Sequence, residues 1–251
     1  MKKIAIKLAV LLAGLLPAKY RFSFINSMLS QQLILIMDQL NNNLSNGIVV
    51  YDIGAHKGTW TKQLKIEIPS VNSFMFEANA IHESDLKKIG CWYNIGILSD
   101  SEKMVDFYSC GGTGDSLYRE STDTYENIMP NKQKCYILDK LVEEKEIPFP
   151  DFIKVDTQGS ELDVLRGASK CLSHAKSILL ECPIYPYNFE APSMKDYIDF
   201  MLEKDFYPSQ CTEIHNIHGV FLQVDIVFLH KNILEKVDNR FPHFFKIKQQ
   251  V

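Results

Sequence analysis

Residues 49–60 read VVYDIGAHKGTW, and this stretch decides the fold of the chain. Its apolar, β-branched start is typical of a strand that is buried on both faces of a parallel sheet. Gly54 and Gly58 then let the backbone turn sharply and approach a ligand that a Cβ atom would exclude. The stretch therefore predicts a strand, a ligand-binding turn and a helix, in that order.

A second signal follows one helix later. The apolar run FMF at residues 74–76 ends in Glu77. In a nucleotide-binding α/β unit, an acidic residue at the tip of the second strand accepts hydrogen bonds from ribose hydroxyls. The two signals together predict a cofactor that contains adenosine.

The turn differs from the glycine pattern of a dinucleotide site. That pattern, G-x-G-x-x-G, holds a pyrophosphate against bare backbone and a helix N-terminus, and here its middle glycine is missing. Asp52, at the head of the turn, would also repel a pyrophosphate, whereas it suits a ligand with an amino group or a positive charge. S-adenosyl-L-methionine carries a sulfonium, an amino group and a ribose diol. We therefore predict this cofactor, with Asp52, Gly54, Ala55, Gly58 and Glu77 as binding residues.

Composition limits the class of protein. The 251 residues include 27 Lys and Arg against 31 Asp and Glu, and the net charge of −4 argues against nucleic acid as a partner. A hydrophobic fraction of 46% excludes a disordered chain. The six cysteines form no C-x-x-C pair, so we expect reduced thiols, a cytoplasmic location and no metal site.

The N-terminus predicts a helical extension over residues 1–46, ahead of one α/β domain over residues 47–251. Apolar residues recur at helical spacing from Ile4 to Leu15, beside several lysines, and Leu33–Leu40 predicts a further helix. The first apolar run is too short to span a bilayer. It could pack on its own domain, form a dimer interface or contact a membrane surface peripherally. The oligomeric state is left open.

Strands and helices alternate through the rest of the chain. Alternation predicts a parallel sheet between two layers of helices, with ligands bound at the carboxyl ends of the strands. The glycine-rich residues 110–116 predict a mobile loop beside that edge. Strands are expected at 48–53, 73–77, 91–98, 152–156, 177–181 and 221–230, a hairpin arm at 103–109, and helices at 59–66, 82–89, 137–146, 160–172 and 194–203.

The second strong motif is FIKVDTQGSELDVLRGA at residues 152–168. It places Asp156 at the end of a central strand, where a carboxylate can accept a proton from a substrate hydroxyl. Glu161 and Asp163 fall in the first turn of the next helix, which favours acids, and Ser160 with Asp163 fits a capping box. We take Asp156 and Glu161 as the catalytic candidates.

Three further groups of residues are weaker candidates. Glu181 ends the fifth predicted strand and shares the geometry of Asp156. His215 and His218 fall in a stretch that we expect to be a polar loop before the last strand, where a solvated turn is the more ordinary role. Tyr185, Tyr187 and Phe189 could form an aromatic wall or pack within a loop.

Five segments together resemble the FkbM family of methyltransferases, over residues 51–231. They are residues 52–58, Glu77, residues 115–117, residues 154–168 and residues 224–228. The resemblance implies a Rossmann-like, doubly wound, seven-stranded sheet whose last strand is antiparallel. It also implies S-adenosylmethionine-dependent O-methylation of a hydroxyl on a sugar, glycan, glycolipid or natural-product acceptor.

Within that resemblance, Ser99 and Asp100 would flank the adenine, and Asp156 would contact the acceptor hydroxyl. One departure from the family pattern matters for the chemistry; in that pattern the Asp is usually followed by Val-Glu-Gly-x-Glu. This chain has Gln158 in place of that first Glu, so a neutral amide replaces a charge beside the reaction centre. A catalytically silent binding or scaffold protein with the same fold is therefore the alternative. A nicotinamide-dependent oxidoreductase is disfavoured by the glycine pattern.

Overall fold

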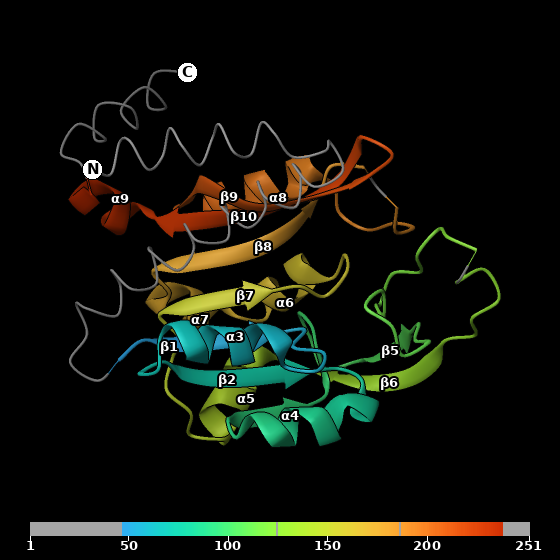
Figure 1. The fold of residues 1–251 in the computed structure, drawn as a ribbon, viewed down its shortest axis with the longest axis horizontal. Helices are drawn as coiled ribbons and strands as arrows, with labels where there is room; N and C mark the ends of the chain where they lie inside the picture. The colour runs from blue at the N-terminus through green and yellow to red at the C-terminus, as the bar shows by residue number, and fades with distance from the viewer. Residues whose placement is uncertain (1–46, 124, 186, 238–251) are drawn as a thin grey trace, which may run out of the picture.

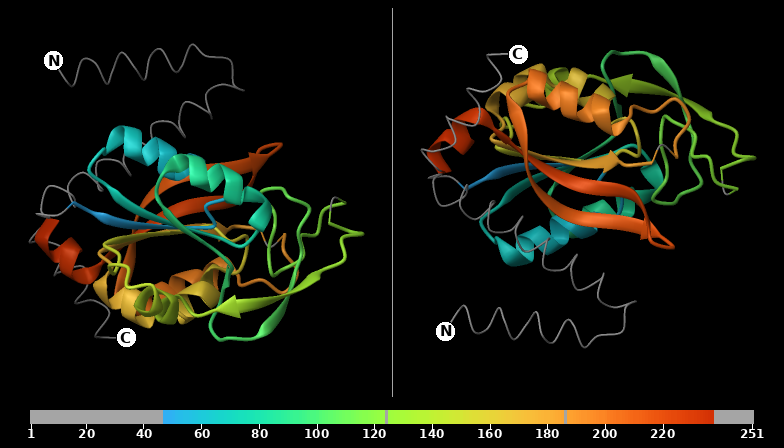
Figure 2. Two further views of the ribbon diagram at one scale, coloured as in Figure 1. Left: turned by 90° about the horizontal axis from the view of Figure 1, so that it is seen from below. Right: turned by 90° about the horizontal axis from the view of Figure 1, so that it is seen from above.

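The computed structural model describes residues 47–123, 125–185 and 187–237. They form a seven-stranded sheet with helices on both faces, and a three-stranded sheet beside it (Figures 1 and 2). The predicted extension over residues 1–46, with its proposed membrane or dimer contacts, lies outside the described residues. Within the described part of the chain, none of the helices combines the length and apolar character needed to cross a membrane.

The large sheet has the strand order β3-β2-β1-β7-β8-β10-β9, and β10 runs antiparallel to both of its neighbours. This confirms the predicted doubly wound α/β fold. The strands are β1 Val49–Ile53, β2 Asn72–Glu77, β3 Trp92–Ile95, β7 Phe152–Val155, β8 Ser177–Pro183, β9 Phe206–Ile217 and β10 Val220–His230.

Alternating side chains of the central strands pack on two helical layers. Val50 of β1 faces α3, whereas Tyr51 and Ile53 join the larger core cluster on the opposite face. Figure 2 shows α3 and α4 on one face and α5 to α8 on the other. The helices are α3 Thr59–Glu67, α4 Glu83–Ile89 after the short η1 Ala80–His82, α5 Leu138–Glu144, α6 Glu161–Arg166, α7 Ser169–His174, α8 Met194–Glu203 and α9 Lys231–Val237.

Two predicted elements are divided in the structure. The strand expected at 91–98 breaks at Gly96, and its second half becomes β4 Ile97–Leu98 of the small sheet, with β5 Met104–Phe107 and β6 Asn131–Tyr136. The helix expected at 160–172 breaks at Gly167, where a Cβ atom would lie 2.3 Å from the Ser99 carbonyl oxygen. The close approach of the Ser99 carbonyl therefore requires a glycine at the point where the helix breaks.

The polar loop predicted around His215 is wrong, because these residues lie in β9. The strand occupies the edge of the sheet and carries Pro208, which an edge strand tolerates. His218 does lie in the tight turn between β9 and β10, with a φ of 52°. Because this edge strand mixes polar and apolar residues, the sequence pattern did not predict a strand here.

Gly54 has a φ of 77°, and a Cβ atom there would lie 1.8 Å from the carbonyl oxygen of Asp156. The turn after β1 is thus pressed against the end of β7. Gly58, with a φ of 70°, packs against Ile89 and Met75 instead. The predicted sharp turn is confirmed, but the atoms that exclude a Cβ at both glycines belong to the protein itself.

Candidate active site

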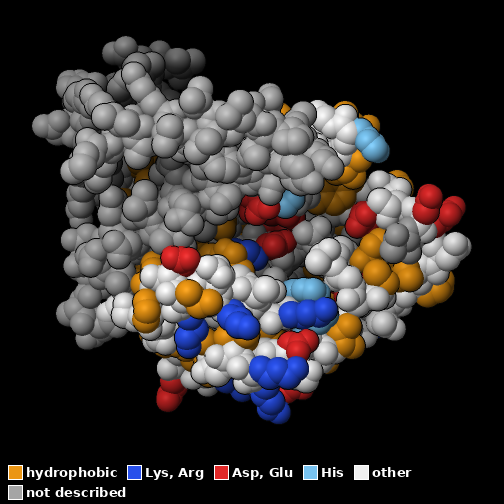
Figure 3. Space-filling view, in the orientation of Figure 1, with side chains coloured by type: hydrophobic (Ala, Val, Ile, Leu, Met, Phe, Trp, Pro, Cys, Tyr) orange, Lys and Arg blue, Asp and Glu red, His pale blue; other side chains and the backbone are white. Residues whose placement is uncertain are grey.

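A cavity of about 680 Å³ opens at the carboxyl ends of the strands. Its walls come from the β1 turn, the ends of β2, β7 and β8, the β3–β4 connection, the loop at 112–122 and the β9–β10 hairpin. Acidic side chains gather at this hollow in Figure 3. Of the predicted site residues, Gly54, Glu77 and Asp156 line the cavity.

Glu77 forms one end of the cavity, at the tip of β2. Its Oε2 accepts a hydrogen bond from the His56 backbone N–H (2.6 Å), and its Oε1 accepts one from the Asn79 N–H (2.8 Å). Burial raises the pKa of this carboxyl group above its usual range. Because each carboxylate oxygen has two lone pairs, Glu77 keeps acceptor capacity for a diol.

Asp52 lies below the cavity, not on its wall. Its side chain is fully buried on the α3 face of β1, where its Oδ2 accepts a hydrogen bond from Thr61 Oγ1 (2.7 Å). Its Oδ1 lies 3.5 Å from Lys154 Nζ. Ala55 is buried beside it, and its N–H donates to the Phe76 carbonyl. Asp52 and Ala55 are therefore buried beneath the turn and help to hold its backbone in place.

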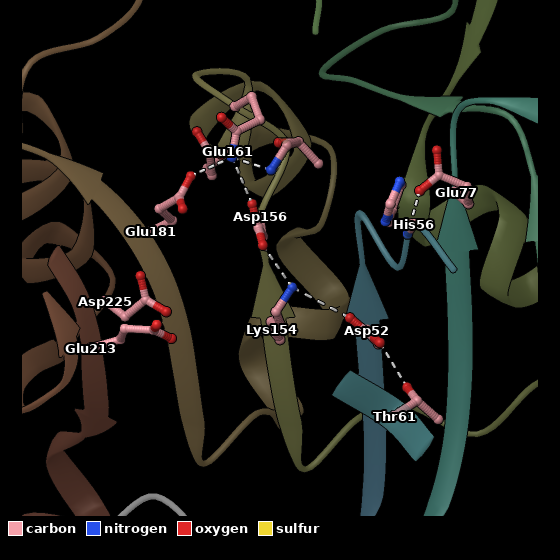
Figure 4. A network of polar contacts seen from close by, with 12 residues as sticks. Asp52, His56, Thr61, Glu77, Lys154, Asp156, Glu161, Glu181, Glu213 and Asp225 are labelled. Atoms are coloured by element: carbon pink, nitrogen blue, oxygen red, sulfur yellow. Dashed lines mark hydrogen bonds and ion pairs between the residues drawn. The ribbon is translucent and has the colours of Figure 1, made fainter. Parts of the chain in front are cut away.

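Lys154 joins two carboxylates, and sequence reasoning did not single it out. Its Nζ is 3.0 Å from Asp156 Oδ2, so Asp52, Lys154 and Asp156 form a continuous charged chain (Figure 4). Burial alone would lower the pKa of Lys154, but attraction from Asp156 and then Asp52 raises it above its usual value. Lys154 is therefore a buried cation at neutral pH.

Asp156 is ionised and reaches the cavity. Its side chain is 33% exposed. Burial alone would raise its pKa, but the charge and hydrogen bond of Lys154, with the amide of Gln158, hold the pKa below its usual range. A carboxylate is thus available at this point for a substrate hydroxyl.

Gln158 bridges the two carboxylates that face the cavity. Its Nε2 donates to Asp156 Oδ1 (3.0 Å) and to Glu181 Oε2 (2.5 Å). A glutamate at this position would add a third negative charge, whereas the amide supplies two donors. The backbone carbonyl oxygen of Gln158 accepts from Ser116 Oγ (2.7 Å) and Asn188 Nδ2 (2.6 Å), which fixes the turn to two loops.

Glu161 lies behind the cavity wall and holds the turn after β7. Its side chain is fully buried. Its carboxylate accepts from the N–H groups of Thr157 (2.7 Å) and Gly159 (2.9 Å) and from the Tyr197 hydroxyl. Burial raises its pKa to about 7. This geometry gives Glu161 a positioning role.

The predicted capping box is absent from α6. Ser160 makes no side-chain cap and donates its hydroxyl to the Thr157 carbonyl. Asp163 instead accepts from the Tyr118 hydroxyl (2.8 Å) and pairs with Arg166. The turn geometry, which sequence spacing does not specify, directs both side chains elsewhere.

Glu161 makes the stability of the protein dependent on pH. A native pKa near 7 against an unfolded value of 4.5 means that the native state binds the extra proton between these values. The stabilisation is complete below about pH 4.5 and is lost as pH rises through 7, by about 3 kcal/mol. We expect Glu161→Gln to remove this part of the slope in urea unfolding between pH 5 and 8.

The matched control is Glu67→Gln, at the exposed end of α3. Its pH profile should run parallel to that of the unaltered protein. If the profile of Glu161→Gln also runs parallel to it, the carboxyl group of Glu161 titrates alike in the folded and unfolded states, and the assignment is wrong.

Ser99 and Asp100 lie away from the cavity wall, in the turn between β4 and β5. Asp100 Oδ1 pairs with Lys103 Nζ (2.6 Å) and accepts from the Ser99 and Ser101 hydroxyls. The break at Gly96 ends the third strand early, so Gly96, Ile97 and Leu98 form the wall there.

The loop at 110–116 is tied down on both sides of the cavity. Asp115 Oδ1 accepts from the N–H groups of Cys110 (2.9 Å) and Gly111 (3.2 Å), and its Oδ2 accepts from Asn79 Nδ2 (2.7 Å). The Ser116 hydroxyl reaches the turn after β7. These bonds join the loop to Asn79, which follows β2, and to the turn after β7.

The far end of the cavity contains residues that the sequence ranked low. Glu181 and His215 line it, and Tyr187 donates its hydroxyl to Gln223 Oε1 (2.5 Å). Gln223 in turn donates to Glu181. Tyr185 also lines the cavity, whereas Phe189 lies outside it, under the guanidinium of Arg119.

Comparison with known proteins gives one family match and several distant relatives. A family model described as the methyltransferase FkbM domain matches residues 52–208. The hexuronic acid methyltransferase AglP of Haloferax volcanii is 28% identical over 139 residues, which are 53% of this chain and 55% of AglP. The chain thus aligns with about half the length of this relative.

Solved structures with similar folds include two methyltransferases. Precorrin-6y C5,15-methyltransferase from Geobacter metallireducens GS-15 has a TM-score of 0.45 at 13% identity, covering 80% of this chain and 88% of that one. Magnesium protoporphyrin IX methyltransferase from Synechocystis PCC 6803 has a TM-score of 0.46 at 7% identity, covering 82% and 83%.

Proposed function

Because the chain belongs to the FkbM methyltransferase family, we propose that it transfers the methyl group of S-adenosyl-L-methionine to a hydroxyl group of a sugar acceptor. The observation that carries the proposal is the order of groups along one cavity. Glu77, Asp156 and Glu181 follow one another in Figure 4, and Tyr187 is joined to Glu181 through Gln223, with Tyr185 also on the cavity wall. A ribose acceptor, a proton acceptor and an aromatic surface therefore follow one another along the cavity wall.

The residues at the β1 and β2 ends fit the cofactor. The Gly54 backbone faces the cavity without a side chain, and Glu77 offers free lone pairs to a ribose diol. Gly96, Ile97 and Leu98 would flank the adenine in place of Ser99 and Asp100. Asp52, Ala55 and Gly58 would act indirectly, by holding the shape of the turn. A volume of about 680 Å³ lies within the usual range for a cofactor pocket.

Asp156 would accept the proton of the acceptor hydroxyl. The sulfonium supplies an activated methyl group when the cofactor is bound, so alignment and proton removal remain for the protein. The acceptor oxygen becomes strongly acidic as its bond to carbon forms, so a carboxylate of low pKa is a sufficient base. Lys154 and Gln158 hold the two oxygens of Asp156, and Glu161 holds the turn that follows.

A saccharide acceptor is supported by two observations. Exposed Tyr185 beside Tyr187 provides the kind of flat surface on which sugar rings stack. The relative AglP is named a hexuronic acid methyltransferase. The amide groups of Gln158 and Gln223 add neutral hydrogen-bonding partners at the same end.

Cofactor binding is tested by thermal unfolding with S-adenosylhomocysteine. A ligand at 100 times its dissociation constant adds about 2.7 kcal/mol, which raises the melting temperature by several degrees. We expect Glu77→Ala to abolish this rise, because the diol loses its acceptor. The control Glu67→Ala, on the exposed end of α3, should keep the full rise.

The outcomes separate the candidate functions. No rise with S-adenosylhomocysteine at millimolar concentration contradicts the transferase assignment. A rise with NAD in its place supports an oxidoreductase. A rise without methyl transfer to any of a panel of sugars, lipid-linked sugars and hydroxylated natural products supports the silent binding protein.

A further inference from the structure

Four carboxylates lie in one row across four neighbouring strands. Asp225 of β10 is directly opposite Glu181 of β8 and Glu213 of β9. Asp156 follows Val155, which is opposite Leu180, so it continues the row beside Glu181. Like charges directly opposite in a sheet are destabilising. The row therefore concentrates negative charge beyond what the fold requires.

An imidazole stands against this row. His215 is two residues from Glu213 on β9, and its Nε2 lies 3.7 Å from Glu213 Oε1 and 4.0 Å from Asp225 Oδ1. One ligand atom each from Glu181, His215 and Asp225 can be chosen so that all three lie within 4.8 Å of one another. Three different strands thus direct nitrogen and oxygen donors toward a common point.

Asp225 is the second, independent observation. Its Oδ1 is shielded from solvent and has no hydrogen-bond partner among the described residues. A buried polar atom without a partner is costly. Lys154 does not serve it as an ion-pair partner, because its Nζ pairs with Asp156 and Asp52. Burial, and then repulsion from Asp156, raises the pKa of both Glu181 and Asp225.

We propose that Glu181, His215 and Asp225 bind a divalent metal ion at the floor of the cavity. Two carboxylates and one imidazole suit a cation of intermediate softness such as Mn²⁺ or Zn²⁺. Three protein ligands leave coordination positions free, and Glu181 and His215 also line the cavity. Figure 4 shows two of these ligands, Glu181 and Asp225, together with the neighbouring Glu213.

Metal binding at this site does not depend on the transferase assignment, because neither the cofactor nor the acceptor is needed for it. Its role in the reaction does rest on the proposed function. A cation there would lie beside Asp156, joined to Glu181 through Gln158. It would bind an acceptor oxygen as a Lewis acid and ease removal of its proton.

Metal binding is tested with Mn²⁺ and the full chain, after treatment with a chelator and with no cofactor or acceptor present. The electron paramagnetic resonance signal of free Mn²⁺ should fall as the protein takes up one ion per chain. We expect Asp225→Asn, Glu181→Gln and His215→Ala each to weaken binding by about tenfold or more, a loss of about 1.4 kcal/mol. Addition of Zn²⁺ or Mg²⁺ to the loaded protein then ranks the metals by displacement.

The matched control is His218→Ala, in the tight turn of the same hairpin, which should bind Mn²⁺ as the unaltered protein does. Thermal unfolding in the presence of chelator shows whether each variant folds. Asp225→Asn and Glu181→Gln keep the shape of the side chain and relieve repulsion within the row of carboxylates. Absence of Mn²⁺ uptake, and of Zn²⁺ uptake measured by equilibrium dialysis of the same protein, overturns the proposal. Uptake that Asp225→Asn and His215→Ala leave unchanged also overturns it, because the ion then binds elsewhere.

Discussion

Lys154→Met is expected to lower the free energy of unfolding by about 3–5 kcal/mol, because it leaves the fully buried carboxylate of Asp52, and the partly exposed one of Asp156, without their cation. Lys154 is 9% exposed, Asp52 is fully buried, and both Asp52 and Asp156 lie within ion-pair distance of Nζ. Methionine keeps the length of the side chain and its packing, so the loss reports on charge. Urea unfolding near neutral pH measures it.

Two companion variants make the test specific. Lys170→Met breaks an exposed ion pair with Glu143 and should lower the free energy of unfolding far less, because solvent screens that pair. Asp156→Asn combined with Lys154→Met should recover part of the loss, since one stranded charge is removed. If Lys154→Met lowers the free energy of unfolding no more than Lys170→Met does, the charges of Asp52, Lys154 and Asp156 do not stabilise this edge of the sheet.

Asp156→Asn is expected to reduce kcat by about 10²–10⁴-fold, because the acceptor loses the group that takes its proton. Asparagine keeps the shape, and its carbonyl oxygen can still accept from the Gln158 amide. The melting-temperature rise with S-adenosylhomocysteine should persist, since Glu77 and Gly54 are untouched. Transfer of a labelled methyl group to an accepted sugar, at saturating cofactor, measures the change.

Asp163→Asn is the matched control, since Asp163 lies in the same segment but contacts Tyr118 and Arg166. Its kcat should stay close to that of the unaltered protein. Loss of the S-adenosylhomocysteine response in Asp156→Asn would instead assign Asp156 to cofactor binding. An unchanged kcat in that variant would remove it from the reaction.

The parts of the site that sequence reasoning found depend on local structure. A buried apolar strand followed by Gly54, or ending in Glu77 or Asp156, carries its whole signal within a few residues. Such segments predicted the fold class and the cavity edge correctly. Gly96 was the local exception, since one glycine within an apolar run gave no sign that the strand would leave its sheet.

The missed parts depend on which strands become neighbours. Asp225 opposes Glu181 through the register of β10 on β8, and His215 reaches them from β9. The sequence of residues 206–217 does not predict an edge strand, because one face of such a strand is polar and no continuous apolar run marks it. Lys154 could have been found, since a lysine inside an apolar strand ahead of Asp156 needs a buried anion.

The contact between Gly54 and the carbonyl of Asp156 separates the reaction geometry from acceptor choice. The Asp156 N–H also donates to the Ile53 carbonyl (3.0 Å), so main-chain contacts join the two strand ends in addition to the ion pair between Lys154 and Asp52. The backbone spacing between the Gly54 turn and Asp156, the proposed base, is then set within the sheet, and Lys154 and Gln158 hold the carboxylate itself. Loop residues that make no hydrogen bond to these two strand ends can be exchanged for others without resetting that backbone spacing. A scaffold of this kind can change its substrate by loop replacement while its chemistry stays constant.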